Sequence, residues 1–217
     1  MSETNTTSRA TLAAVSAAVV AIAAQVAGKA VRDALFLSEF PVTALPTMVI
    51  VSSIVSVVVV LLTSRLFARF GPSTVSPIAF AVSAVLSLVE WSFLDSYPRV
   101  VGAAVYLHFA VFGTILISGL WSVVNERFDP RTAKSTIGRV TLGATAGGVV
   151  GGVLAERVAA YFSVDWMLPI LAFIQIIAAI LVASIGTGRD RARAKREPSS
   201  ENGFDVLARN GYLREIA

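Results

Sequence analysis

The stretch Trp121–Gly152 reads WSVVNERFDPRTAKSTIGRVTLGATAGGVVGG, and it decides the fold of this chain. An apolar helix ends in a cluster of charges, and a second helix rich in glycine follows it. Gly143, Gly147 and Gly151 recur every fourth residue, so they fall on one helix face, where another helix backbone can approach closely. Interior glycines weaken a helix in water by about 0.5–1 kcal/mol each, but inside a bilayer the backbone has no partner other than its own helix. The stretch therefore predicts a membrane-spanning helix that packs through its glycine face.

Composition places the whole chain in the membrane class. Of its 217 residues, 55% are hydrophobic and 15% are charged, whereas soluble domains carry about 25% charged residues. The lipid bilayer is thus the first partner that the sequence predicts. The absence of cysteine excludes disulfides and thiolate metal sites. The net charge of +4 is explained by basic cytoplasmic loops, so we expect no nucleic-acid partner.

Six apolar runs are long enough to cross a bilayer, which takes about 20 residues. We expect spans at Thr11–Leu37, Leu45–Leu66, Val75–Leu94, Arg99–Val124, Thr136–Phe162 and Trp166–Ile185. The resulting domains are a cytoplasmic tail at 1–10, disordered over Met1–Ser8, a six-span bundle at 11–186, a basic cytoplasmic linker at 187–202 and the start of a truncated seventh helix at 203–217. The first span is not a secretory signal, because its apolar run continues too far and lacks a cleavage site.

The loops predict the orientation. Basic residues gather on one side of the membrane at Arg65, Arg69, Arg127, Arg131, Lys134 and throughout the tail from Arg189 to Arg196. The positive-inside rule therefore puts both termini in the cytoplasm, in a plasma or inner membrane. Six spans with both ends inside describe an all-α bundle of the kind that forms the N-terminal half of a major-facilitator-like transporter. Such a half needs a partner, either a missing C-terminal six-span half or a second protomer.

Lys29, Arg32 and Asp33 stand out because cations are unusual near the outer end of a span. Their i, i+3, i+4 spacing puts them on one helix face, where the planar fork of arginine can bind phosphate oxygens. We take them as substrate-binding residues. The alternative is a helix end at which cations reach the interface and Lys29 pairs with Asp33. Counting about 1.5 Å per residue from Thr11 puts Lys29 some 27 Å along, close to the outer boundary.

His108, the only histidine, lies inside the fourth span. It is a further candidate for substrate binding or a proton-linked role, or else it makes an interhelical contact. Glu90 and Trp91 could form a buried acid beside an aromatic wall. More simply, Trp91 belongs to the interfacial belt and Glu90 lies near the headgroups.

The connection between the fourth and fifth spans carries candidate gating residues: Asn125, Glu126, Arg131, Lys134 and Arg139. Ion pairs among them would hold one state of a transporter and break in another. The alternative is a solvated loop in which Asp129-Pro130 starts the next helix, with Arg139 extending the cytoplasmic cluster.

Several segments resemble the nucleotide transporter family, the ATP/ADP antiporters of plastids and intracellular bacteria. The resemblance rests on Lys29–Leu37 with its Arg32-Asp33 pair, Leu45-Pro46, Trp121, Asn125, Ala133-Lys134, Leu142-Gly143-Ala144 and Tyr161-Phe162-Ser163. It covers roughly residues 10–217, the amino-terminal half of such a protein. It implies a major-facilitator-like fold that binds ATP and exchanges it for ADP by alternating access.

The chain departs from that family pattern at two points. The exchangers place a lysine a few residues after the Arg-Asp pair, whereas here Lys29 precedes it; their acidic residue in the fourth span has no counterpart around His108. The resemblance therefore implies exchange of a nucleotide or another phosphate-bearing solute. The alternative is a sensor or anchor that does not transport and is coupled to cytoplasmic domains. No catalytic arrangement, cofactor motif or metal-ligand cluster occurs in the sequence, so we expect neither an enzyme nor a cofactor.

Overall fold

The computed structural model describes the backbone of residues 2–128 and 130–186 and the side chains of 9–128 and 136–185. Every regular element in that part of the chain is helical. The elements are α1 (Ser2–Glu39), the 3₁₀ turn η1 (Val42–Ala44), α2 (Leu45–Phe70), α3 (Pro72–Phe93), α4 (Pro98–Arg127), α5 (Pro130–Tyr161), the 3₁₀ turn η2 (Val164–Trp166) and α6 (Met167–Gly186). Six of them are long and apolar enough to span a membrane, which confirms the predicted multi-pass helical bundle.

Proline and glycine set the helix boundaries. Proline occupies the first or second position of α2, α3 and α4, where its missing N–H is not needed. α5 likewise begins at Pro130, six residues before the expected span and where the alternative interpretation of that connection put the helix start. The turn from α2 into α3 passes through Gly71, whose φ of 79° is a conformation that favours glycine. α1 differs from expectation because it begins at Ser2, so the segment expected to be a disordered tail is helical.

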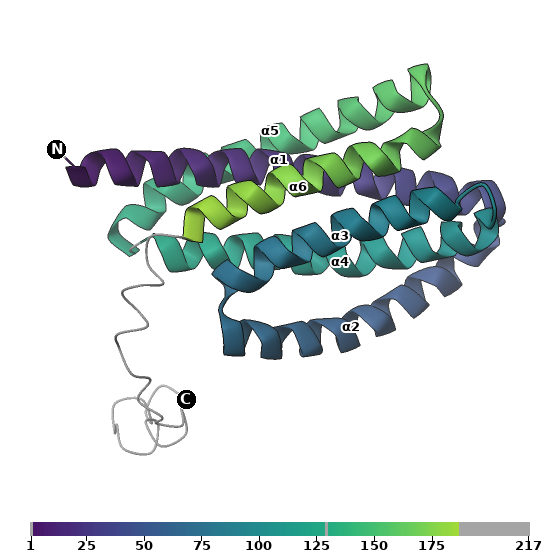
Figure 1. Ribbon diagram of the computed structural model, residues 1–217, viewed down its shortest axis with the longest axis horizontal. Helices are drawn as coiled ribbons and strands as arrows, with labels where there is room; N and C mark the ends of the chain where they lie inside the picture. Colours follow the sequence, from purple (N-terminus) through teal and green to yellow (C-terminus); the bar gives the residue numbers. More distant parts are fainter. Residues whose placement is uncertain (1, 129, 187–217) are drawn as a thin grey trace, which may run out of the picture.

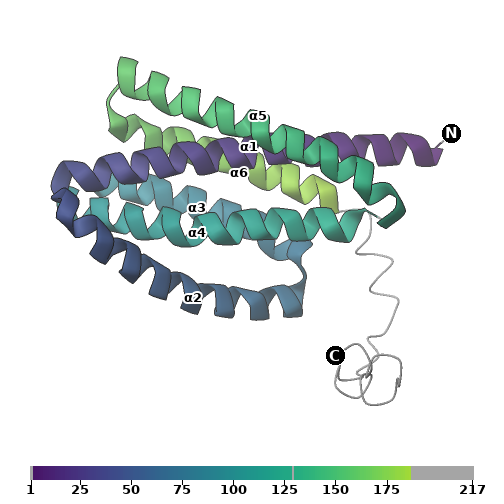
Figure 2. The same ribbon diagram turned by 180° about the vertical axis from the view of Figure 1, so that it is seen from behind.

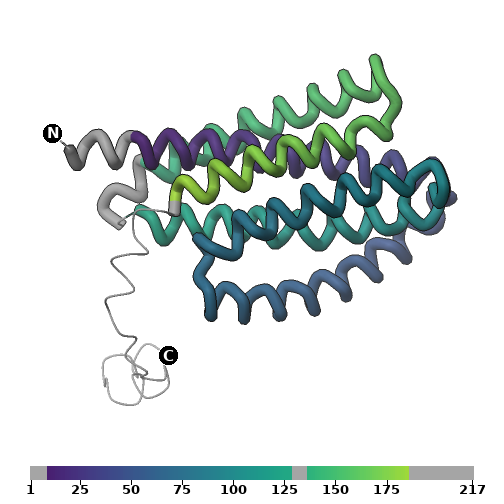
Figure 3. Tube along the Cα trace, in the orientation of Figure 1, coloured from purple at the N-terminus to yellow at the C-terminus, as the bar shows by residue number. Residues whose placement is uncertain are grey.

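The helices form two layers. α5, α1, α4 and α2 lie side by side in that order in one layer, and α6 and α3 form the second (Figures 1 and 2). α1 packs against α5, α6 and α4, while α4 packs against α2, α3 and α1, and α3 packs against α6. The purple N-terminal part of α1 and the yellow-green C-terminal part of α6 lie at the same end of the bundle, which we call the terminal end (Figure 3). The opposite end, where α1 ends and α4 begins, is the far end.

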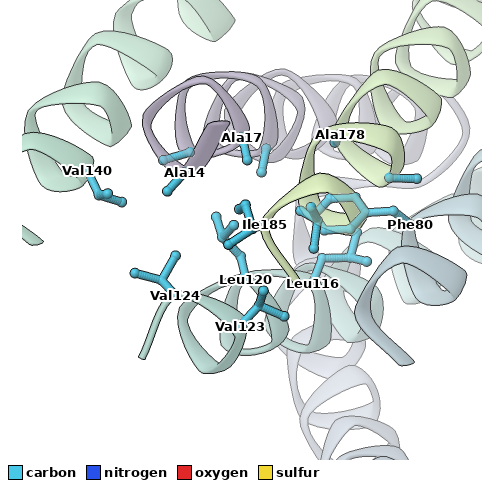
Figure 4. Close-up of a cluster of buried hydrophobic side chains, with 14 of the residues drawn as sticks. Ala14, Ala17, Phe80, Leu116, Leu120, Val123, Val124, Val140, Ala178 and Ile185 are labelled. Carbon is cyan, nitrogen blue, oxygen red and sulfur yellow. The ribbon is translucent and has the colours of Figure 1, made fainter. Parts of the chain in front are cut away.

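Two apolar clusters hold the layers together. The cluster towards the terminal end joins α1, α3, α4, α5 and α6 through Ala14, Ala17, Phe80, Leu120, Val140 and Ile185, among others (Figure 4). The second cluster lies towards the far end and includes Ala27, Val105, Phe109, Leu168 and Leu171. The buried residues that α1 contributes are all alanine in the first cluster, and Ala24 and Ala27 beside Val31 and Leu35 in the second, so its backbone approaches its neighbours closely.

Large apolar side chains cover most of the outer surface. They are exposed along the whole length of α2 and at many positions of α3, α5 and α6. α2 is the least embedded of these helices, since Ser52 is its only buried residue. This surface suits contact with lipid tails. The predicted linker at 187–202 and seventh helix at 203–217 fall outside the described residues, and the membrane and its orientation stay predictions.

Candidate functional site

The glycine face of α5 lies directly on the backbone of α1. A Cβ atom at Gly143 would come within 3.0 Å of the carbonyl oxygen of Val15. At Gly147 and Gly151 it would collide with the carbonyl oxygens of Val19 and Ala23, and it would lie 2.9 and 2.8 Å from their Cα atoms. The three glycines therefore meet three successive turns of α1. The sequence predicted packing through this face, and the structure identifies the partner helix.

Contacts between the antiparallel α1 and α4 fix the depth of the candidate binding residues. Gly28 lies against the ring of Phe109, and Leu35 lies against Gly102 near the far end. The apolar part of α1 runs over 31 residues to Glu39, and Lys29 lies five residues beyond its midpoint, about 8 Å at ~1.5 Å per residue. In a bundle centred on the bilayer, Lys29 thus lies well inside the hydrocarbon core, which reaches about 15 Å from its centre. Counting residues from Thr11 had put Lys29 close to the outer boundary. The structure indicates a deeper position, because α1 continues beyond Leu37 to Glu39.

Arg32 connects α1 with α4. Its guanidinium carbon lies 4.5 Å from the ring centroid of Tyr106 on α4, and its Nε donates to a carboxylate oxygen of Asp33 at 2.8 Å. The Arg32 side chain is 18% exposed and that of Asp33 is 47% exposed. Asp33 therefore pairs with Arg32. The alternative interpretation, in which Asp33 pairs with Lys29, is wrong on this point. Lys29 is exposed and forms no ion pair within the described part of the chain.

The surface around these charges differs from the rest of the bundle. Between Leu12 and Leu37, α1 exposes no large apolar side chain, and neither does α4 after Val100 up to its last described turn. Exposed positions on this surface are instead charged, small or polar: Lys29 on α1, and Ala104, Thr114, Ser118 and Asn125 on α4. We call it the α1–α4 strip. Figure 2 shows the two helices side by side, with α5 and α2 on either side.

His108 points away from the strip and into the interface with α3. Its Nδ1 lies 2.9 and 3.1 Å from the two carboxylate oxygens of Glu90, and its Nε2 lies 2.8 Å from the hydroxyl oxygen of Ser83. The side chains of His108 and Glu90 are only 3% and 11% exposed. The histidine therefore holds the Glu90 carboxylate inside the bundle, as the interpretation of Glu90 as a buried acid had it, and the depth of Glu90 relative to the headgroups stays a prediction.

Sequence reasoning named Glu90 and His108 separately. It missed Ser83, and it did not predict that the three side chains form one hydrogen-bonded cluster. A signal was available, because a short turn centred near residue 95 joins α3 and α4 into an antiparallel hairpin. Residues equally far from that turn lie at the same level, and Ser83 and His108 are such a pair.

The structure places only part of the candidate gate. Asn125 and Arg139 are exposed and Glu126 is half-buried at the terminal end, where α4 ends and α5 begins. The side chains of Arg131 and Lys134 fall outside the described residues. The gate therefore stays a prediction.

A shallow cavity of about 370 Å³ opens at the far end between the end of α3 and the turn η2. The rings of Trp91 and Trp166 line it, with centroids 5.8 Å apart, together with the carboxylates of Asp95 and Asp165. Two exposed tryptophans at one end of a bundle fit an interfacial aromatic belt.

No metal-binding group of three or more histidine or acidic side chains occurs among the described residues. No family model matches the chain, and no similar curated protein or solved structure was found.

Proposed function

We propose that this chain is one six-helix half of an alternating-access transporter, and that its α1–α4 strip lines the path of a phosphate-bearing solute. The observation that carries the proposal is the exposed, unpaired Lys29 five residues from the midpoint of its span, on a surface without large apolar side chains among the described residues. A charge at the bilayer centre costs about 2.5–3.5 kcal/mol by insertion scales, so ionisable residues at such depth face a water-filled cavity or a protein partner.

The helix pairing supports a major-facilitator-like half. Such halves contain two inverted repeats of three helices each. If α1–α3 and α4–α6 are such repeats, then the packing of α1 on α5 matches that of α4 on α2, and the packing of α1 on α6 matches that of α4 on α3. Both matches are present. A second six-helix bundle facing the strip, on the same chain or another copy, would complete the cavity.

The residues of the strip suit an anionic substrate. Lys29 supplies an ammonium group that no described carboxylate neutralises, and Arg32 offers the remaining N–H groups of a guanidinium already held by Tyr106 and Asp33. A preorganised guanidinium binds phosphate oxygens in two places and loses little side-chain freedom in doing so. ATP and ADP are the substrates that the family resemblance suggests.

The test is uptake of labelled ATP, ADP and inorganic phosphate into proteoliposomes that hold the chain together with any sequence that follows it. We expect saturable uptake that requires a counter-substrate inside and is lost in Lys29→Ala and Arg32→Ala. Arg99→Ala is the matched control, since Arg99 also lies over an aromatic ring, that of Phe40, but at the far end. Folded protein that takes up none of the three compounds would refute the proposal and favour the sensor or anchor.

A further inference from the structure

The cluster of Ser83, Glu90 and His108 lies apart from the α1–α4 strip, and solute binding makes no use of it. Ser83 is fully buried, and the imidazole lies between the hydroxyl on one side and the carboxylate on the other. Burying such groups is unfavourable unless their hydrogen bonds are satisfied, and here both ring nitrogens have partners. The cluster therefore holds a proton-accepting imidazole in a defined place inside a membrane bundle.

The arrangement accommodates two protonation states. In the neutral imidazole, Nδ1–H donates to Glu90 and Nε2 accepts from the hydroxyl of Ser83. When a proton binds at Nε2, that nitrogen donates to the Ser83 oxygen, and the hydroxyl hydrogen turns towards a carbonyl of the preceding turn. The neighbouring Ser87 already makes such a bond, to the carbonyl of Ser83 at 3.1 Å. One proton can thus be added while every ring nitrogen keeps a partner.

Few other charges compete for this proton. Phe109 and Phe112 cover the imidazole, with ring centroids 4.6 and 5.2 Å from that of His108. The described ionisable groups of α3, α4 and the helices packed against them are Arg9, Lys29, Arg32, Asp33 and Glu39 on α1, Arg65 and Arg69 on α2, Arg99, Tyr106, Glu126 and Arg127 on α4, and none on α6. None of them forms an ion pair with Glu90 or His108 in the described structure.

The far end is the end of the bundle nearer to Glu90, which lies three residues before the end of α3 at Phe93. The Glu90 side chain keeps 11% of its surface exposed. The next residue, Trp91, lines the far-end cavity, where Asp95 and Asp165 place two further carboxylates. The cluster is also connected to the strip, because α4 carries His108 two residues after Tyr106, which holds Arg32.

We propose that Glu90 and His108 form a proton-binding site inside the bundle, loaded from the far end. Binding adds one proton to the Nε2 lone pair and converts an imidazole–carboxylate pair into an imidazolium–carboxylate pair, which tightens the contact between α3 and α4. Use of this proton as the coupling ion of transport rests on the proposed function. The proton binding itself does not.

The chain contains a single histidine, so ¹⁵N-histidine labelling reports on this site alone. We would record the two ring nitrogen resonances of the full chain in lipid nanodiscs from pH 5 to 9. We expect one transition, with Nε2 moving between its neutral and its protonated position. In Glu90→Gln the midpoint differs from that of the native chain, because the imidazolium loses its counter-charge.

The controls separate proton binding from structure and from transport. Glu156→Gln removes an exposed carboxylate paired with Arg157 on α5 and leaves the midpoint unchanged. Glu90→Asp keeps the negative charge, so its titration midpoint should lie closer to the native midpoint than that of Glu90→Gln. This variant also keeps the test informative if Glu90→Gln does not fold. Ring nitrogen shifts that stay constant from pH 5 to 9 in folded protein would overturn the proposal, as would identical midpoints with Asp, Gln and Glu at position 90. Neither result depends on solute uptake, so failure here is distinct from failure of the transporter proposal.

Discussion

Substituting the central glycine of α5 tests the packing that holds the first layer together. In Gly147→Ala the new methyl would collide with the carbonyl oxygen of Val19 and lie 2.9 Å from its Cα and 3.0 Å from its carbonyl carbon. All three are backbone atoms, so no side chain can rotate away and α1 must separate from α5. Inserting a carbon into a close-packed site costs about 1–3 kcal/mol. Contacts of the Cα–H···O type, worth about 0.5–1 kcal/mol each, weaken as well.

Gly152 provides a control on the same helix and in the same sequence context. A Cβ atom there would meet nothing within 4 Å. Gly152→Ala is thus expected to be neutral or slightly stabilising, since alanine favours a helix over glycine by up to about 1 kcal/mol. The two variants should differ by about 2–3 kcal/mol in the free energy of unfolding, a factor of roughly 30–150 in the equilibrium constant.

The measurement is unfolding of the purified chain in lipid–detergent bicelles by increasing sodium dodecyl sulfate, followed by circular dichroism and tryptophan fluorescence. Gly151→Ala should behave like Gly147→Ala, because it collides with the carbonyl oxygen of Ala23. Equal unfolding free energies for the Gly147 and Gly152 variants would refute the close approach of α1 and α5.

Two further predictions concern the α1–α4 strip. The chain lacks cysteine, so single cysteines report on their own surroundings. Thr114→Cys and Ser118→Cys should react with a water-soluble maleimide in intact membranes, whereas Val57→Cys on α2 should not. Equal labelling at all three positions would contradict a water-filled strip. Tyr106→Ala should raise the half-saturation concentration for uptake about tenfold, because it removes a cation–π contact with Arg32 worth about 1–2 kcal/mol. Tyr106→Phe keeps the ring, so its half-saturation concentration should stay near the native value. Similar values for both variants would show that the ring does not position Arg32.

Helix positions followed from the sequence because hydropathy and helix boundaries are local properties. Each apolar run is bounded by residues that start or end helices, such as Pro72 and Pro98, and the observed helices overlap all six expected spans. The glycine spacing on α5 likewise predicted a packing face. The identity of its partner did not follow, because it depends on which of five other helices meets that face.

The polar sites show the limit of local patterns more clearly. The spacing of Lys29, Arg32 and Asp33 predicted a shared helix face, but the depth of that face depends on where α1 ends. Arg32 lies over Tyr106 because α1 and α4 are antiparallel neighbours, which no local pattern encodes. Glu90 is charged and close to the end of α3, so local reasoning put it at the membrane surface. Only the pairing of α3 with α4 brings His108 within 2.9 Å of it.

The parallel contact between α1 and α5 has a consequence for how the chain is made. The contacting residues Val15 and Gly143 are 128 positions apart, so at ribosomal rates of about 5–20 residues per second α1 enters the bilayer on the order of ten seconds before its partner exists. During that interval the alanine-rich surface of α1 and the guanidinium of Arg32 lack some of the neighbours that later pack against them. The long apolar stretch of α1 retains the helix in the bilayer over this period. Biogenesis of this protein therefore requires its first helix to stay inserted in the bilayer, with its α5-facing side uncovered, until the fifth helix has been synthesised.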